Sequence, residues 1–529
     1  MKLSRKLILL VTILISVNLA ACADEAEDTA GTEDVNEGNQ QGGDLVIASG
    51  SDIVTLDPTG SNDLPSFNIQ HNIFEQLVRQ DENMEPQPSL AESWESIDDT
   101  TWEFKLREGV KFHDGSDFNA DVVKANIERI LDPDIAATGA NRLEMISEVK
   151  VVDDYTVHFI TEYPFSPLPA HLANNVAGMI SIEQIEDDYA AMEEGEDPGS
   201  VINQNPAGTG YFKFEDWEPG QHIRLIKNEE YWDGEANLDS VTFKVVPEDL
   251  TRIAELETGD SHVSHPLSPS DIAQVETSDK LYVNRQSSLG IDYLGFNLEK
   301  EPFDDERVRQ AISMAIDKEQ IVEGIYDGVG ITAAGPLAPD VFGYDESIDG
   351  IKYDPEAAQE LLAEAGYEDG FSTTIWTNED REREDMATNV QAQLAEIGID
   401  VEVKILEWGA YLDETANGNH DMFVLGWYSG TGDADNSLYP LFHSNNLGSS
   451  GNKTFTQNDD IDAQLEEARQ APQEERVALY SELQEMLVEH APMVYMLHKE
   501  YLLGVSETVK GLSQAPTQML ELKDAYIEE

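Results

Sequence analysis

The chain has a single cysteine, Cys22, among its 529 residues. A disulfide within the chain needs two cysteines, so packing and non-covalent contacts alone must stabilise the fold. The same count leaves no further thiolate for a soft metal or for haem attachment. A hydrophobic content of 40% and seven tryptophans are compatible with a packed core. We therefore expect a globular body, long enough for two or more domains.

The surroundings of Cys22 indicate export. Three basic residues and an apolar run over 7–20 precede it, which is typical of a secretory signal and too short for a membrane span. The run Leu19-Ala-Ala-Cys22 resembles the lipobox of bacterial lipoproteins, whose cysteine is diacylated after cleavage. We predict a signal peptide over 1–21 and a lipid anchor at Cys22, since two acyl chains give stable anchoring. The alternative is an ordinary signal peptide with an incidental cysteine.

The charge of the chain is strongly negative. It has 106 acidic and 32 basic residues, and loss of the predicted signal removes three basic residues, which takes the net charge from −74 to −77. Such a charge argues against binding nucleic acid and against docking of the folded surface on anionic lipid. It favours a solvated surface suited to a salty medium, where screening removes most self-repulsion. Acidic patches that bind a cationic partner are the alternative.

Strands and helices are predicted to interleave along the chain. Residues 23–42 are polar and acidic, which predicts a flexible linker before the body. In the body, Asn119 is a plausible N-cap for one of the predicted helices. The periodicity predicts strands at 45–48 and 401–405, hairpins over 102–112 and 149–160, and helices over 66–79, 120–131, 304–317, 355–365, 386–397, 461–469 and 473–489. This alternation indicates α/β lobes.

Motifs for catalysis are weak. The sequence has no Gly-x-Ser-x-Gly, no His-Glu-x-x-His and no phosphate-binding loop. Ser147 and Lys150 fit Ser-x-x-Lys without its companion motifs, and His262 and His265 have no further metal ligands near them in sequence. We therefore predict no catalytic residue, no metal and no cofactor. A cell-envelope hydrolase or a sensor lipoprotein is the rival class, and a hydrolase would need a nucleophile–base pair that the sequence does not offer.

An ordered set of motifs carries a family resemblance from about residue 44 to beyond 501. The most diagnostic stretch is Phe104-Lys-Leu-Arg-Glu-Gly-Val-Lys-Phe-His-Asp-Gly115. Others are Leu56-Asp57-Pro58, Phe74-Glu-Gln-Leu-Val78, Pro88-Ser-Leu-Ala-Glu-Ser-Trp94, Gly208-Thr-Gly-Tyr211, Tyr231-Trp232, Ala315-Ile-Asp-Lys318 and Leu361-Leu-Ala-Glu-Ala-Gly366. The chain resembles the family 5 solute-binding proteins of ABC importers, which bind peptides, dipeptides, nickel or glutathione.

The resemblance implies an α/β fold of the periplasmic-binding-protein type II clamshell, in which two lobes close on the ligand. Lobe I would comprise 43–290 with an extra subdomain over 88–204, lobe II would comprise 291–499, and 500–529 would return to lobe I. The protein would be an extracytoplasmic monomer, attached to the cell membrane only through Cys22. It would deliver a small peptide to the permease and ATPase subunits of an ABC transporter, and would bind no nucleic acid.

The segment from Leu425 to Ser444 bears on the ligand. In dipeptide and oligopeptide binders an aspartate three residues after the tryptophan holds the ligand's ammonium, but three residues after Trp427 stands Gly430. Asp433 or Asp435 could supply that charge, or could cap a turn. The segment resembles the glutathione-binding branch. A general oligopeptide or dipeptide binder is the runner-up, and a nickel-chelate binder is third.

Further binding residues follow from the resemblance. Relatives place a carboxylate-binding arginine after the strand that corresponds to 373–376, where this chain has Arg381 and Arg383. The alternative for these arginines is a solvent-facing ion pair on a helix. Trp427 is predicted to be a platform in the cleft, with a role in the core as the alternative. Tyr428 is a further candidate, and Ser66 and Phe67 are candidates in lobe I.

Overall fold

The computed structural model describes residues 42–61, 63–448 and 451–528. The predicted signal peptide, Cys22 and nearly all of the predicted linker lie outside these residues. Contacts join residues 41–529 into one unit. Within the described part of the chain, no helix has both the length and the apolar character needed to cross a membrane.

A seven-stranded sheet contains β1, which lies between β10 and β11 and is parallel to both. Leu45 and Ile47 of β1 are fully buried in the core cluster that this sheet shares with α1. The strand order is β12 (Leu281–Ser287), β19 (Glu500–Ser506), β11 (Val263–His265), β1 (Asp44–Ser49), β10 (Ser240–Val245), β9 (His222–Lys227) and β8 (Phe212–Glu218). The C-terminal part of the chain thus returns to the sheet in which the body begins.

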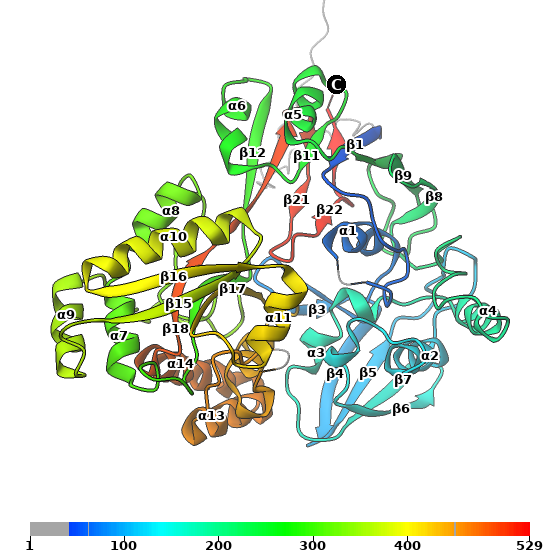
Figure 1. Cartoon of the computed structure of the whole chain (residues 1–529). Coiled ribbons are helices and arrows are strands. Elements are labelled where there is room, and N and C mark those ends of the chain that lie inside the picture. Colours follow the sequence, from blue (N-terminus) through cyan, green and yellow to red (C-terminus); the bar gives the residue numbers. More distant parts are fainter. Residues whose placement is uncertain (1–41, 62, 449–450, 529) are drawn as a thin grey trace, which may run out of the picture. The chain divides into compact units, whose positions relative to one another are not determined.

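A second, six-stranded sheet is built from the later part of the chain (Figure 1). Met422 to Leu425 are all buried, as a strand covered on both faces requires. The order is β14 (Ile331–Thr332), β18 (Met493–His498), β13 (Gly290–Phe296), β17 (Met422–Tyr428), β15 (Phe371–Asn378) and β16 (Ile399–Leu406). Helix α10 (Arg381–Glu396) packs on β15, β16 and β17.

The chain crosses between the two large sheets at two adjacent places. Strand β12 ends at Ser287 and β13 begins at Gly290, while β18 ends at His498 and β19 begins at Glu500. The Ser288 amide donates to the Lys499 carbonyl at 2.9 Å, which holds the two crossings side by side. Both connections are only one or two residues long, so a change in the angle between the sheets would have to be absorbed there.

Helix α2 packs on a four-stranded antiparallel sheet (Figure 1). Its order is β4 (Ala91–Asp98), β5 (Thr101–Leu106), β7 (Thr156–Thr161) and β6 (Ile146–Asp153). The predicted helix 120–131 is confirmed as α2 (Ala120–Leu131), capped by the Asn119 side chain. The predicted hairpin 102–112 is wrong, because β5 pairs with β4 and β7 instead of with the residues that follow it.

The remaining helices and short strands surround the three sheets described above. The other helices are α1 (Leu64–Ile73), α3 (Leu168–His171), α4 (Ile182–Glu193), α5 (Asp249–Thr258), α6 (Ile272–Glu276), α7 (Glu306–Met314), α8 (Lys318–Ile325), α9 (Pro355–Glu364), α11 (Trp408–Ala416), α12 (Ala434–Phe442), α13 (Asp459–Gln470) and α14 (Gln473–His490). Short pairs of strands are β2 (Val78–Gln80) with β3 (Pro86–Pro88), β20 (Val509–Lys510) with β23 (Tyr526–Ile527), and β21 (Ser513–Gln514) with β22 (Leu520–Glu521). The predicted helix 66–79 therefore ends early, since 78–80 form β2.

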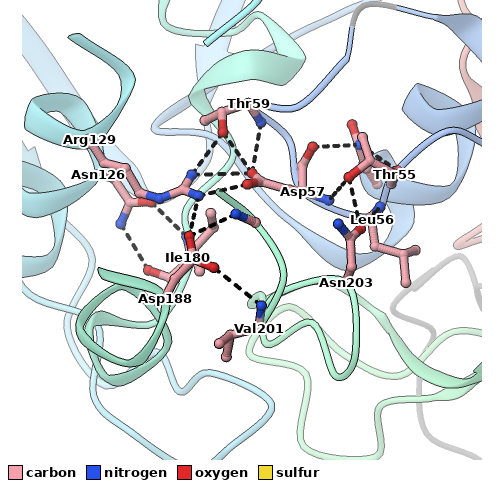
Figure 2. Close-up of polar contacts among 12 residues, drawn as sticks. Thr55, Leu56, Asp57, Thr59, Asn126, Arg129, Ile180, Asp188, Val201 and Asn203 are labelled. Atoms are coloured by element: carbon pink, nitrogen blue, oxygen red, sulfur yellow. Dashed lines mark hydrogen bonds and ion pairs between the residues drawn. The ribbon is translucent and has the colours of Figure 1, made fainter. Parts of the chain in front are cut away.

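A buried ionic network ties the four-stranded layer to the loop after β1 (Figure 2). Arg129 of α2 contacts the carboxylates of Asp57 at 2.7 Å and of Asp188 at 2.9 Å, and its side chain has no exposed surface. Asp188 also accepts from the amides of Gly199 and Val201. Burial lowers the pKa of Arg129, but Asp57 and Asp188 outweigh it and raise that pKa overall. The network thus joins four segments of the chain around one cation whose charge is balanced by two carboxylates.

Candidate functional site

A cavity of about 1170 Å³ is lined by residues from distant parts of the chain, between Leu64 and Asp524. One wall comes from α1, β2, the turns near residues 141–145 and 171–175, and the C-terminal segment 511–524. The opposite wall comes from the end of β17, the loop that follows it, and α12. Aromatic side chains and polar groups from both walls line it. The volume slightly exceeds that of common small-molecule pockets, so it suits a ligand of peptide size.

The motifs of the first wall converge on Glu75. Its carboxylate accepts from the Thr209 hydroxyl and the Tyr231 hydroxyl at 2.7 Å each, and from the Trp232 indole at 2.9 Å. Gly208 allows this close approach, because a Cβ there would lie 2.0 Å from the carbonyl oxygen of Ile73. Burial raises the pKa of Glu75, and the three donors only partly oppose it. The cavity therefore holds a carboxylate with donors but no ion-pair partner among the described residues.

Two further charged groups meet on the same wall. His71 of α1 contacts Glu521 of β22 at 3.0 Å. Burial lowers the pKa of His71, but the negative charges of Glu521 and Glu75 together raise it overall. Burial raises the pKa of Glu521, but the positive charges of His71 and Arg79 together lower it overall. The pair thus joins α1 to the C-terminal segment inside the cavity.

Trp427 and Tyr428, at the end of β17, both line the cavity. The Trp427 indole donates to the carbonyl of Asn436 at 3.0 Å, which fixes the ring against the start of α12. Tyr428 is 36% exposed. The structure therefore places both side chains at the wall where the sequence predicts binding residues.

Asp433 and Asp435 lie next to this wall, and each is paired with an arginine, which is buried for Asp433 and partly buried for Asp435. Asp433 contacts Arg476 at 2.6 Å and caps α12 through the amide of Asp435. Asp435 lines the cavity and accepts two hydrogen bonds of 3.0 Å from Arg469. Both carboxylates therefore have their charge balanced within the protein.

The two candidates of α1 differ in exposure to the cavity. Phe67 lines it, whereas Ser66 is fully buried and is not among the lining residues. The Ser66 hydroxyl accepts from the amides of Val54 and Thr55 and donates to Asp63. Ser66 thus holds the loop before α1, which in turn positions Phe67.

Arg381 and Arg383, in the first turn of α10, are not among the residues that line the cavity. The Arg381 side chain is 95% exposed and approaches Asp385 at 3.7 Å. Arg383 donates to the Asn378 side chain at 2.9 Å and lies over the ring of Trp408. Their role as carboxylate partners stays a prediction.

Arg142 is a cavity residue that the sequence did not single out. It ends a short 3₁₀ helix (Ala140–Arg142) and faces Gly430 of the opposite wall. A Cβ on Gly430 would lie 3.1 Å from Nη2 and 3.2 Å from Nε of Arg142. No periodic pattern or motif marks Arg142 in the sequence, so only the structure reveals it.

Metal ligation is not indicated in the part of the chain that the structure describes, where no group of three or more His, Cys, Asp or Glu side chains could hold an ion. His262 instead accepts from the amide of Val46 through Nδ1. Ser147 donates to the carbonyl of Ile160 within the sheet.

Comparisons with known proteins agree with this architecture. The family described as "Bacterial extracellular solute-binding proteins, family 5 Middle" matches residues 85–449. Heme-binding protein A of Haemophilus influenzae is 32% identical, over 98% of this chain and 97% of that protein. The glutathione-binding protein GsiB of Pectobacterium atrosepticum is 33% identical, over 92% of this chain and 94% of that protein.

A solved structure supports the fold. The periplasmic binding protein DppA of Helicobacter pylori, in complex with the peptide STSA, is 32% identical with a TM-score of 0.76, and the match covers 93% of this chain and 99% of that one. This similarity confirms the expected α/β, two-lobed fold of type II periplasmic binding proteins. The chain belongs to the family 5 bacterial extracellular solute-binding proteins.

Proposed function

We propose that this protein captures a small peptide in the cavity between its lobes and delivers it to the permease and ATPase subunits of an ABC importer. The observation that carries the proposal is the cavity itself, which is lined by aromatic side chains and by acidic and basic groups on both of its walls. Backbone and side-chain groups on both walls could then hold an extended ligand, with its side chains in the wider parts. The family and the peptide-bound relative support the same reading.

We propose lobe boundaries at the two crossings between the large sheets. Lobe I comprises 43–290 with 500–529 and includes the subdomain over 88–204, and lobe II comprises 291–499. The short crossings at 288–289 and 499 would then act as the hinge on which the lobes close. The ligand would be bound by one wall first and enclosed by the other.

Glutathione is the ligand that we propose. It carries two carboxylates and one ammonium, so it needs partners of both signs. The cavity offers such partners, among them Arg142 and Glu75. The similarity to a glutathione-binding protein supports this choice. A general oligopeptide or dipeptide binder remains the main alternative.

Calorimetry with a panel of ligands tests the ligand class. Glutathione, the dipeptide Met-Leu, a tetrapeptide, haemin and a nickel–histidine chelate would each be titrated into the purified body of the protein. We expect glutathione to bind, and at about 100 times its Kd to raise the free energy of unfolding by about 2.7 kcal/mol. Binding of neutral dipeptides without binding of glutathione would favour the general peptide reading. Absence of binding by the whole panel would contradict the proposed function.

We also propose that Cys22 is diacylated and holds the protein at the outer face of the cell membrane. Replacing Cys22 by Ser should release the protein into the medium or leave the signal uncleaved, because the hydroxyl cannot form the thioether to lipid. Fractionation and mass spectrometry of the mature N-terminus would measure this. Normal processing and membrane retention of the Cys22→Ser protein would count against the lipid anchor.

A further inference from the structure

The guanidinium of Arg142 has no ionic partner among the described residues. No carboxylate lies within ion-pair distance, and its Nε is buried without a hydrogen-bond partner. Burial lowers the pKa of Arg142. An arginine that is partly removed from water and left without an acceptor is costly, so such groups are commonly completed by a ligand.

The other cations of the cavity are placed differently. Arg469 is paired with Asp435, and its guanidinium lies 3.5 Å from the ring centre of Tyr439. Lys523 contacts Asp233 at 2.7 Å. Arg79 is exposed on β2 and lies near Glu521, whose carboxylate pairs with His71. Arg142 is therefore the cavity cation with both partial burial and an unmet need for an anion.

Gly430 lies against the guanidinium of Arg142. Its amide donates to the Asn436 side chain at 2.8 Å, and its carbonyl accepts from Asn174 at 2.6 Å, so the backbone is held in place on both sides. A Cβ here would lie 3.1 Å from Nη2 and 3.2 Å from Nε of Arg142, closer than ordinary van der Waals contact. Glycine therefore lets the guanidinium lie against this backbone, and an aspartate at 430 would bring a competing carboxylate to it.

We propose that Arg142 binds a carboxylate of the ligand on the side of its guanidinium that faces the cavity. This inference rests on the proposed peptide-capture function and names the chemical class that the site selects: peptides with an anionic group at this position. A guanidinium can hold a carboxylate through two parallel hydrogen bonds. Asn174 and Asn436, which fix Gly430, would act as positioning residues. Selectivity for anionic peptides would then come from Arg142 of one lobe, which lies opposite the backbone of Gly430 in the other lobe.

The test combines changes in the protein with changes in the ligand. Calorimetry would compare the wild type, Arg142→Met and Arg142→Lys with glutathione and with glutathione in which either carboxylate is an amide. We expect Arg142→Met to weaken glutathione binding roughly 10- to 150-fold, as loss of a charge-assisted hydrogen bond does. Arg142→Lys should lose less, because it keeps the charge without the two-pronged geometry. Amidation of the contacted carboxylate should cost affinity in the wild type and little further in Arg142→Met.

Controls separate this inference from the function on which it rests. Arg307→Met removes an exposed arginine that pairs with Asp305 away from the cavity, and should leave binding unchanged. Failure of the wild type to bind any peptide would contradict the proposed function. Binding by the wild type with equal affinity in Arg142→Met would overturn the role of Arg142 alone. Loss of affinity in Arg381→Met or Arg383→Met, with none in Arg142→Met, would assign the carboxylate to those residues.

Discussion

Two arginines from neighbouring segments of the chain show how differently one residue type can be used. Arg129 is wholly buried and contacts two carboxylates (Figure 2), whereas Arg142 lies at the cavity with no carboxylate partner among the described residues. The surroundings raise the pKa of Arg129 and lower the pKa of Arg142. Burial of a charge is tolerated when its partners are built in, and an incomplete set of partners points to a ligand. The difference separates a group that holds the fold from a group that we assign to binding.

The largest effect should come from Arg129→Met. It would leave Asp57 and Asp188 buried without their cation, and breaking a buried pair in this way costs about 3–5 kcal/mol. Chemical denaturation would measure the free energy of unfolding. The control Arg224→Met removes a partly exposed arginine that contacts Glu215, and should change that energy by no more than about 0.5 kcal/mol. Equal free energies of unfolding for Arg129→Met and the control would contradict the claim that Arg129 stabilises the fold.

Salt should act on the two regions in opposite senses. Raising the salt concentration from about 0.05 M to 1 M shortens the screening length to about 3 Å and reduces repulsion among the exposed acidic groups, so the melting temperature should rise. The same salt should weaken binding of an anionic peptide at Arg142, which solvent reaches through the open cavity. Calorimetric unfolding and titration over that range would check both. A flat melting temperature would remove the case for salt adaptation, and salt-independent affinity would weaken the case for charge recognition.

The smallest effect should be the pH dependence of the His71–Glu521 pair. The raised pKa of His71 means that its contribution to stability is full below the unfolded value of 6.5 and is lost as the pH rises through the folded pKa. The lowered pKa of Glu521 means that its contribution is present above 4.5 and is lost as the pH falls through its folded pKa. The difference in unfolding free energy between wild type and Glu521→Gln should therefore shrink from pH 6 to pH 9. A constant difference would show that the pair does not titrate as described, whereas the Arg129 network should not titrate in this range.

Much of the fold could be predicted from local pattern. The helix 120–131 follows from its N-cap and periodicity, and the hairpin 149–160 from alternation around a polar turn; both are confirmed. The hairpin 102–112 failed because β5 finds its partner in the preceding segment, Ala91–Asp98, which carries no alternating apolar pattern. Pairing between strands there depends on the packing of the whole layer.

The candidate site could be predicted only in part, because several of its contacts join segments that are far apart in the sequence. Trp427 and Tyr428 line the cavity, and Gly430 stood out because a related pattern has an acid in its place. Arg142 gave no such signal, since it is an isolated arginine in the sequence. Its proposed binding role depends on its proximity to Gly430, which belongs to a distant segment of the chain. The partners of Asp433 and Asp435 likewise come from α13 and α14, far along the chain.

The most direct test of Arg142 as the partner of an anionic ligand introduces an aspartate at position 430, where dipeptide and oligopeptide binders have one. Calorimetry would compare glutathione binding by the wild type, Gly430→Asp and the matched, uncharged Gly430→Asn. A Cβ at residue 430 would already lie 3.1 Å from Nη2 of Arg142, so either side chain crowds the guanidinium and only the aspartate also offers it an anion. We therefore expect Gly430→Asp to lose at least roughly 10-fold in affinity. Gly430→Asn should lose less, because it fills similar space without the charge. Equal or tighter binding of glutathione by Gly430→Asp would contradict the claim that Arg142 is kept free for an anionic ligand.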